Sequence, residues 1–180
     1  SVSIASLIAK YTFTPYTGLI NGTLHALGLL PKSEELQWLQ DPNLVWITIS
    51  VMTVWWTIGF SMLLYLSALQ DISPDVYEAA SIDGASSIQQ LFRIVLPLLK
   101  PTTWLVFLLQ MIACFKVFGQ IYMITGGGPA SSTRPLIQYI YENAFGKSNM
   151  GYAAAMSYVL FGILLILSLA QQILQRKGEE

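Results

Sequence analysis

The sequence predicts an all-α protein that crosses a membrane several times. Of its 180 residues, 54% are hydrophobic and only 11% are charged, against roughly 45–50% and about 25% in ordinary globular domains. Long stretches carry no charged residue at all, and turn-forming residues gather between them. A chain so poor in charge is expected to be solvated by lipid, so we expect residues 1–180 to form one polytopic membrane domain.

The counts of charged and metal-binding residues exclude several classes of function. The net charge is −1, so no basic surface points to nucleic acid. Cys114 is the only cysteine and His25 the only histidine, which excludes a disulfide framework and a Cys/His metal cluster built by this chain alone. We therefore predict no metal site. Cys114 is expected to be a small packing residue and His25 a hydrogen-bonded loop residue.

The first 42 residues are expected to hold the end of a span and a loop. The opening SVSIASLIA lacks the positive start, the longer apolar core and the cleavage site of a signal peptide, so residues 1–14 are interpreted as a partial span. Residues 15–42 contain Asn21-Gly22, Gly28 and Pro31, which favour turns. The segment NGT at 21–23 matches a glycosylation acceptor, but an Asn-Gly turn is the favoured interpretation.

Three complete spans are predicted, over residues 43–70, 98–124 and 151–174. Each has the roughly 20 apolar residues that a helix needs to cross a bilayer. Apart from Lys100 near its start, Lys116 is the one charge inside the middle span. A charge within a membrane is a candidate for a functional site, but a lysine can also extend its side chain to the interface, and both interpretations stay open.

Residues 73–97 are predicted to form a helix–turn–helix elbow at the membrane face. Ser73-Pro74 is a typical helix start, with serine as the cap and proline at the first helical position. Gly84 can adopt the left-handed conformation that ends a helix. Ser86 with Gln89 makes a capping box for a second helix, which Pro97 is expected to interrupt.

The composition of this elbow favours a protein partner over a lipid surface. Interfacial helices usually carry lysine and arginine on their polar face, whereas this one has three acids and a single arginine: Asp75, Glu78, Asp83 and Arg93. Val76, Ala79 and Ala80 share a helix face on which another backbone can approach closely. Docking to a protein is therefore favoured, and the alternative is a helix pair lying on lipid head groups.

The same residues carry a resemblance to a known family. Glu78-Ala79-Ala80, then three residues, Gly84, nine residues, and Ile94-x-Leu96-Pro97 form a pattern that resembles the cytoplasmic coupling loop of binding-protein-dependent ABC importer permeases. Further segments are similar to the maltose-type carbohydrate permeases: GLINGTLHALGL, SALQDISPDVYEAASIDGA, ITGGGPASST, and IYENAF followed by GYAAAMSYVL.

This resemblance implies a fold, partners and an orientation. It implies a type I ABC importer permease fold in the bacterial cell (inner) membrane, with a cytoplasmic ABC ATPase dimer, a second homologous permease subunit and an extracytoplasmic solute-binding protein as partners. It implies no cofactor of the chain's own, because the ATPase binds the ATP. The elbow and the tail at 175–180 would be cytoplasmic, and residues 17–41 and 125–150 would face outward. The implied coupling residues are Glu78, Ala79, Ala80, Asp83, Gly84, Ile94, Leu96 and Pro97, with Glu78 pairing to a basic group of the ATPase.

The glycine-rich segment TGGGPASST at 125–133 is not a phosphate-binding loop. It lacks the lysine and the following Ser/Thr of that motif, and it follows a membrane span rather than a strand. The resemblance instead implies an outer loop that contacts the binding protein or gates the cavity. ATP hydrolysis is therefore expected in a partner, and this chain is not expected to be an enzyme.

Candidate substrate residues lie on the first complete span. Thr53, Trp56, Thr57 and Phe60 share one helical face and, counted from Glu78, fall where the maltose-type permeases line their sugar cavity. Hydroxyls and aromatic rings suit a sugar, but helix–helix packing is an equal alternative. On the next span, Gln110 and Cys114 lie one turn apart.

The function expected from the resemblance is that of a permease subunit for a carbohydrate. An importer of another solute, such as glycerol phosphate, would share every motif, and cations near the candidate cavity would point to it. A membrane scaffold or channel without an ATPase partner is the alternative from a different class.

Overall fold

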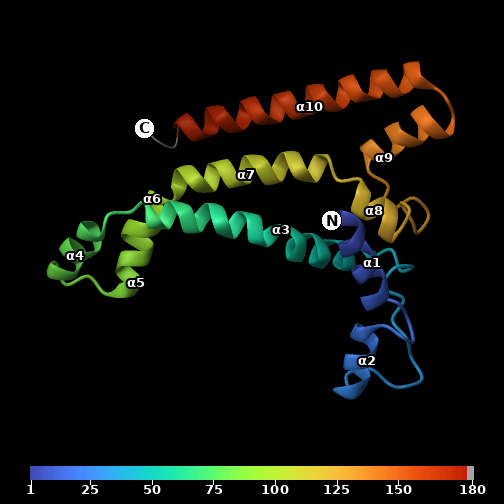
Figure 1. The fold of residues 1–180 in the computed structure, drawn as a ribbon, viewed down its shortest axis with the longest axis horizontal. Coiled ribbons are helices and arrows are strands. Elements are labelled where there is room, and N and C mark those ends of the chain that lie inside the picture. The colour runs from blue at the N-terminus through green and yellow to red at the C-terminus, as the bar shows by residue number, and fades with distance from the viewer. Residues whose placement is uncertain (178–180) are drawn as a thin grey trace. The chain divides into compact units, whose positions relative to one another are not determined.

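The computed structural model describes residues 1–177 and contains only helices and connecting loops within that range (Figure 1). The last three residues of the predicted cytoplasmic tail lie outside it. The elements are α1 (Val2–Thr12), α2 (Leu19–Ala26), α3 (Leu44–Gln70), α4 (Pro74–Ile82), α5 (Ser87–Gln90), the π-helix η1 (Leu91–Val95), α6 (Leu96–Leu98), α7 (Lys100–Phe115), α8 (Gly119–Ile124), α9 (Leu136–Tyr141), the π-helix η2 (Glu142–Gly146) and α10 (Met150–Lys177).

These elements form two compact units. The first unit comprises residues 1–56 and 114–166, and the second comprises residues 57–113 and the chain from Leu167 onward. The long helices α3 and α10 each contribute to both units.

Two helices are long and apolar enough to cross a membrane. They are α3 over Leu44–Gln70 and α10 over Met150–Arg176, and within the described residues a third span exists only if the bent pair Ser87–Leu98 and Lys100–Phe115 is taken as one. Only 11% and 6% of their apolar windows are buried inside the structure. Surfaces this apolar and this exposed require lipid or partner helices around them.

The core of the first unit lies where α8 meets the start of α3. Ile121 is 1% exposed and packs with Val45 and Ile49, and Val117 covers this cluster. Helix α8 also lies along α1. This packing explains the main departure from the predicted middle span.

The predicted span over residues 98–124 is not one continuous helix. Helix α7 ends at Phe115, and α8 begins at Gly119. Lys116 lies in the break and is exposed. Burial of Ile121 and Ile124 holds α8 within the first unit as a short helix of its own. The exact span boundaries stay predictions.

The segment after α1 is also more helical than predicted. The favoured Asn-Gly turn is wrong, because both residues lie inside α2. The Asn21 side chain is 1% exposed; its Nδ2 donates to Glu35 Oε2 (2.6 Å) and Leu36 O (3.1 Å), and its Oδ1 accepts from Trp38 Nε1 (2.7 Å). These tertiary bonds override the local turn preference of Asn-Gly. His25 is likewise helical, although its hydrogen bonding was predicted.

In the second unit, polar side chains join the helices. Tyr65 on α3 donates to Thr103 on α7 (3.2 Å), and Gln110 on α7 donates to Ser61 on α3 (2.9 Å). Gln171 on α10 donates to the Trp104 carbonyl of α7 (2.8 Å). Such bonds are typical of helix contacts in membranes, where apolar surface alone gives no preference for a neighbouring helix over lipid.

Candidate functional site

The first helix of the elbow begins and ends as predicted. The Ser73 Oγ accepts a hydrogen bond from the Asp75 backbone N–H (3.3 Å), and Pro74 occupies the first turn of α4. Gly84 has φ = +77°, which is the left-handed conformation that favours glycine. The Ala85 N–H reaches the Ala80 carbonyl (2.9 Å), which closes the helix end.

The second helix is capped as predicted and is pinned to the first. Gln89 Oε1 accepts from the Ser86 N–H (2.8 Å), and Ser86 Oγ accepts from the Gln89 N–H (3.4 Å), which completes the capping box. Gln90 Nε2 donates to Ser81 Oγ (3.1 Å) and to the Ala85 carbonyl (3.2 Å). Sequence reasoning missed Gln90, because only the fold brings it to the end of α4.

Pro97 does not end this helix as expected. The chain widens into the π-turn η1, in which the Leu96 N–H bonds to the Leu91 carbonyl, and it stays helical to Leu98. Proline removes one backbone donor from a helix interior, and a widened turn is one way to accommodate that loss. The helix then bends by 60° into α7.

The elbow presents a mixed acidic and apolar surface. Glu78, Ala79 and Asp83 are exposed, whereas Ala80 is buried at 7% exposure. Three large apolar side chains project from the same short segment: Ile82, Ile88 and Phe92 are 86%, 70% and 63% exposed. We call these three residues the elbow knobs. Of the remaining predicted coupling residues, Ile94 is half-buried and Leu96 and Pro97 are exposed.

Thr53, the first of the candidate substrate residues, is hydrogen-bonded to other residues of the protein. The Thr53 hydroxyl donates to the Ile49 carbonyl (2.6 Å) and accepts from Gln120 Nε2 (2.6 Å). Thr53 therefore fixes the position of the Gln120 amide. Gln120 was not among the predicted residues, because the break before α8 could not be read from the sequence.

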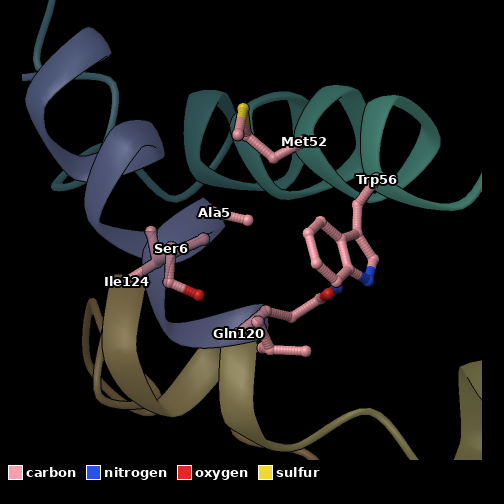
Figure 2. A pocket seen from close by; sticks show the side chains of 7 residues that line it. Ala5, Ser6, Met52, Trp56, Gln120 and Ile124 are labelled. Carbon is pink, nitrogen blue, oxygen red and sulfur yellow. The ribbon is translucent and has the colours of Figure 1, made fainter.

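Trp56 lines a small cavity in the first unit, shown in Figure 2. Ser6 and Ala5 come from α1, Trp56 and Met52 from α3, and the amide end of Gln120 on α8 lies beside the indole ring. None of the lining side chains carries a charge, and the complete set is Val2, Ala5, Ser6, Met52, Trp56, Gln120 and Ile124.

The other predicted substrate residues are not part of this cavity. Thr57 is half-buried and Phe60 is exposed in the second unit. Gln110 bonds to Ser61 in that unit. Cys114 is an exposed free thiol at the end of α7. Their contact with a solute stays a prediction.

The glycine-rich segment after α8 folds back on itself. Thr133 Oγ donates to the Gly128 carbonyl (2.7 Å), and Gln138 Nε2 donates to the Gly126 carbonyl (2.9 Å). Arg134 pairs with Glu142. The loop uses its hydroxyl and amide groups to hold its own backbone, which fits a structural loop better than a phosphate cradle.

A comparison with known protein families identifies the family of this chain. Residues 2–178 match the family described as binding-protein-dependent transport system inner membrane component. The chain belongs to that family. This permease family consists of transport components rather than enzymes, and membership places the chain in the inner membrane.

Individual relatives agree with this assignment. The chain is 34% identical over its whole length to the probable ABC transporter permease protein YurN of Bacillus subtilis, of which it covers 61%. It is 36% identical to the sulfoquinovosyl glycerol transport system permease protein SmoG of Agrobacterium fabrum (90% of the chain, 51% of the relative). It is also 36% identical to the lactose transport system permease protein LacF of Rhizobium radiobacter (92% of the chain, 56% of the relative). The chain thus spans between half and two thirds of the length of these curated relatives.

Solved structures show the same fold. The chain superposes with a TM-score of 0.87 and 26% identity on a chain of a bacterial alginate ABC transporter in complex with its alginate pentasaccharide-bound periplasmic protein. The match covers 98% of this chain and 60% of the other. The all-helical architecture is therefore that of a type I ABC importer permease.

The loop between α1 and α3 of this permease holds one ionisable group with a shifted pKa. The backbone N–H of Tyr16 donates to Glu35 Oε2 (3.1 Å) and lowers the pKa of this carboxyl; Asn21 and His25 lower it further, against an opposing effect of partial burial. His25 Nε2 lies 3.2 Å from Glu35 Oε1. The carboxylate thereby ties the segment around Glu35 to α2.

Proposed function

We propose that this chain is a transmembrane permease subunit of an ATP-driven ABC importer that translocates a carbohydrate delivered by an extracytoplasmic solute-binding protein. The elbow over residues 73–97 carries the proposal. It is rigid, because both helices are capped and Gln90 pins one to the other. It is also exposed, because its acids and its elbow knobs point away from the chain.

A rigid, exposed elbow suits the transmission of movement from a partner. The elbow knobs supply apolar contact area, and Glu78 supplies a charge that fixes orientation against a basic group. The partner that fits is a cytoplasmic ABC ATPase dimer, whose closure would push on the elbow and, through the bend at Leu99, on α7. ATP binding and hydrolysis are assigned to that dimer, and a second homologous permease subunit would complete the pathway.

The uncharged cavity supports a neutral solute. Aromatic and amide side chains suit the C–H faces and hydroxyls of a sugar, and the seven lining residues include no cation for a phosphate. Relatives named for lactose and for sulfoquinovosyl glycerol support a carbohydrate as well. Glycerol phosphate is therefore the less favoured solute.

The proposal is tested by isolating the complete permease from its native membrane and reconstituting it. We expect an ABC ATPase, a second permease and a sugar-loaded binding protein to copurify or to reassemble with it. Vesicles that contain the complex and internal ATP should accumulate a neutral sugar, and vesicles with a non-hydrolysable ATP analogue should not.

Two outcomes would contradict the proposal in different ways. Solute flux without any ATPase partner would show a channel or scaffold. ATP-dependent uptake of glycerol phosphate but of no neutral sugar would keep the importer and overturn the carbohydrate assignment.

A further inference from the structure

An unpartnered hydroxyl lies in the wall of the cavity. Ser6 on α1 is 2% exposed, and its Oγ has no hydrogen-bond partner among the described residues. Buried hydroxyls nearly always have a partner, so an exception calls for a ligand or another explanation. Other helical serines and threonines, among them Thr53, Ser81 and Ser157, instead bond to a carbonyl of the preceding helical turn.

The opposite wall offers a fixed acceptor and an aromatic face. The Gln120 Nε2 is held by Thr53, so the orientation of the amide is set and its Oε1 is the group left to accept a hydrogen bond. Figure 2 shows this amide beside the Trp56 ring, with Ser6 across the cavity from the indole. Trp56 is 41% exposed, which leaves part of its ring uncovered.

We propose that Ser6 and Gln120 form a site for one hydroxyl group of the transported solute, with Trp56 as the wall on which the sugar ring packs. The inference rests on the proposed function and adds two specificity-determining residues to it. The solute hydroxyl would donate to Gln120 Oε1 and accept from the Ser6 Oγ–H, which satisfies all three groups.

The size of the cavity limits what enters it. The free space is about 10 Å³, which holds roughly one water-sized group. A hydroxyl fits this space, whereas a whole sugar ring does not, so the ring would lie outside against Trp56. The uncharged lining makes the site one for a neutral hydroxyl rather than for a phosphate or a carboxylate.

The test compares Ser6→Ala with Ser3→Ala in the reconstituted complex. Ser3 is on the same helix and is exposed, which makes it a matched control. Uptake is measured for a panel of neutral mono- and disaccharides that includes lactose and maltose, and then for the monodeoxy analogues of the sugar imported best. Loss of one uncharged hydrogen bond should raise the KM of Ser6→Ala for the parent sugar by about two- to tenfold.

The analogues show whether one hydroxyl meets this site. For a single monodeoxy analogue, Ser6→Ala and the wild type should have the same KM, because the hydroxyl that Ser6 contacts is absent. Equal KM values of Ser6→Ala and Ser3→Ala for the parent sugar would overturn the hydroxyl site while leaving the importer intact. Uptake of no sugar in the panel would overturn the proposed carbohydrate function and, with it, this site.

A stability measurement tests whether Ser6 has a structural role instead. Because its hydroxyl makes no bond within the described chain, Ser6→Ala should leave the melting temperature of the complex unchanged or raise it. A clear fall in melting temperature relative to Ser3→Ala would show that a partner subunit satisfies Ser6, and it would overturn the proposal.

Discussion

Glu78 is exposed on α4 and forms no ion pair with any residue that the structure describes. Its side chain therefore contributes little to the stability of this chain, and its proposed role lies in contact with the ATPase. Trp56 is likewise expected to matter more for transport than for stability, because its partly exposed ring lines the cavity and is not part of the core. Substitutions at these residues should change transport and spare folding.

Glu78→Lys is expected to abolish most sugar uptake at normal expression. An exposed position tolerates the change within about half a kcal/mol, but a lysine would face the basic group that we propose on the ATPase, and like charges in contact can cost several kcal/mol. Uptake by proteoliposomes is measured beside Glu34→Lys, an equal charge change at an exposed loop residue. Normal uptake by Glu78→Lys, or equal loss in both variants, would contradict the docking role.

Trp56→Ala is expected to weaken transport while the complex still assembles. Loss of the aromatic wall should raise the KM for the sugar by about three- to tenfold, since aromatic contacts contribute about 0.5–1.5 kcal/mol beyond their buried area. Trp55→Ala is the matched control, because Trp55 is exposed and does not line the cavity. Identical uptake curves for the two variants would favour helix packing as the role of Trp56.

The Glu35 carboxylate predicts an acid-sensitive loop between α1 and α3. Because folding lowers the pKa of Glu35, its stabilising contribution is complete above its ordinary pKa of about 4.3. The contribution is lost as the pH falls through the lowered pKa of the folded state. Hydrogen exchange of the Tyr16 amide should therefore accelerate at acidic pH once intrinsic rates are corrected. Glu35→Gln should exchange faster than the wild type at neutral pH, and equal rates there would contradict the assignment.

At the scale of elements, the elbow was predictable because its signals are local. Ser73-Pro74, Gly84 and the Ser86–Gln89 pair each act within one turn of helix, so spacing alone identified both helix starts and the turn. Two of the departures depend on distant contacts. Asn21 is helical because residues 14 to 17 positions away bond to it, and α8 separates from α7 because Ile121 is buried against α3.

Most of the candidate cavity could not be predicted from local sequence patterns either. Trp56 was predicted from its position on one helix, but Ser6 and Gln120 reach the cavity only after α1 and α8 pack together. No local pattern distinguishes Ser6 from Ser3. The π-turn before Pro97 was missed because its widened turn depends on how the backbone accommodates the missing donor.

Gly84→Val is expected to weaken ATPase docking without preventing membrane insertion. A side chain at Gly84 meets no neighbouring atom, so the cost comes from its φ of +77° alone, at about 1–2 kcal/mol for a residue with a Cβ. A β-branched residue suffers most there, whereas asparagine tolerates this conformation. Recovery of the ATPase in detergent pull-downs should fall for Gly84→Val and persist for Gly84→Asn. Full recovery with valine would contradict the role of the turn.

At the scale of the whole molecule, the permease is built to work inside an assembly. The membrane-length helices α3 and α10 bury little of their apolar surface within the chain, and the elbow exposes its knobs. The chain also covers only 51–62% of the first three relatives. The exposed apolar surface of α3 and α10 requires lipid or other helices around it, and the ATPase is the partner we propose for the elbow.

Photocrosslinking from the elbow tests directly whether the elbow docks on an ABC ATPase. A photoreactive phenylalanine analogue replaces Ile88, an elbow knob, in the complete permease in native membranes, and the control replaces Tyr158, which is 77% exposed on α10. We predict that the Ile88 position crosslinks to an ABC ATPase subunit identified by mass spectrometry, and that the Tyr158 position does not. Crosslinking of the Ile88 position to lipid, or to no ATPase, would contradict the account.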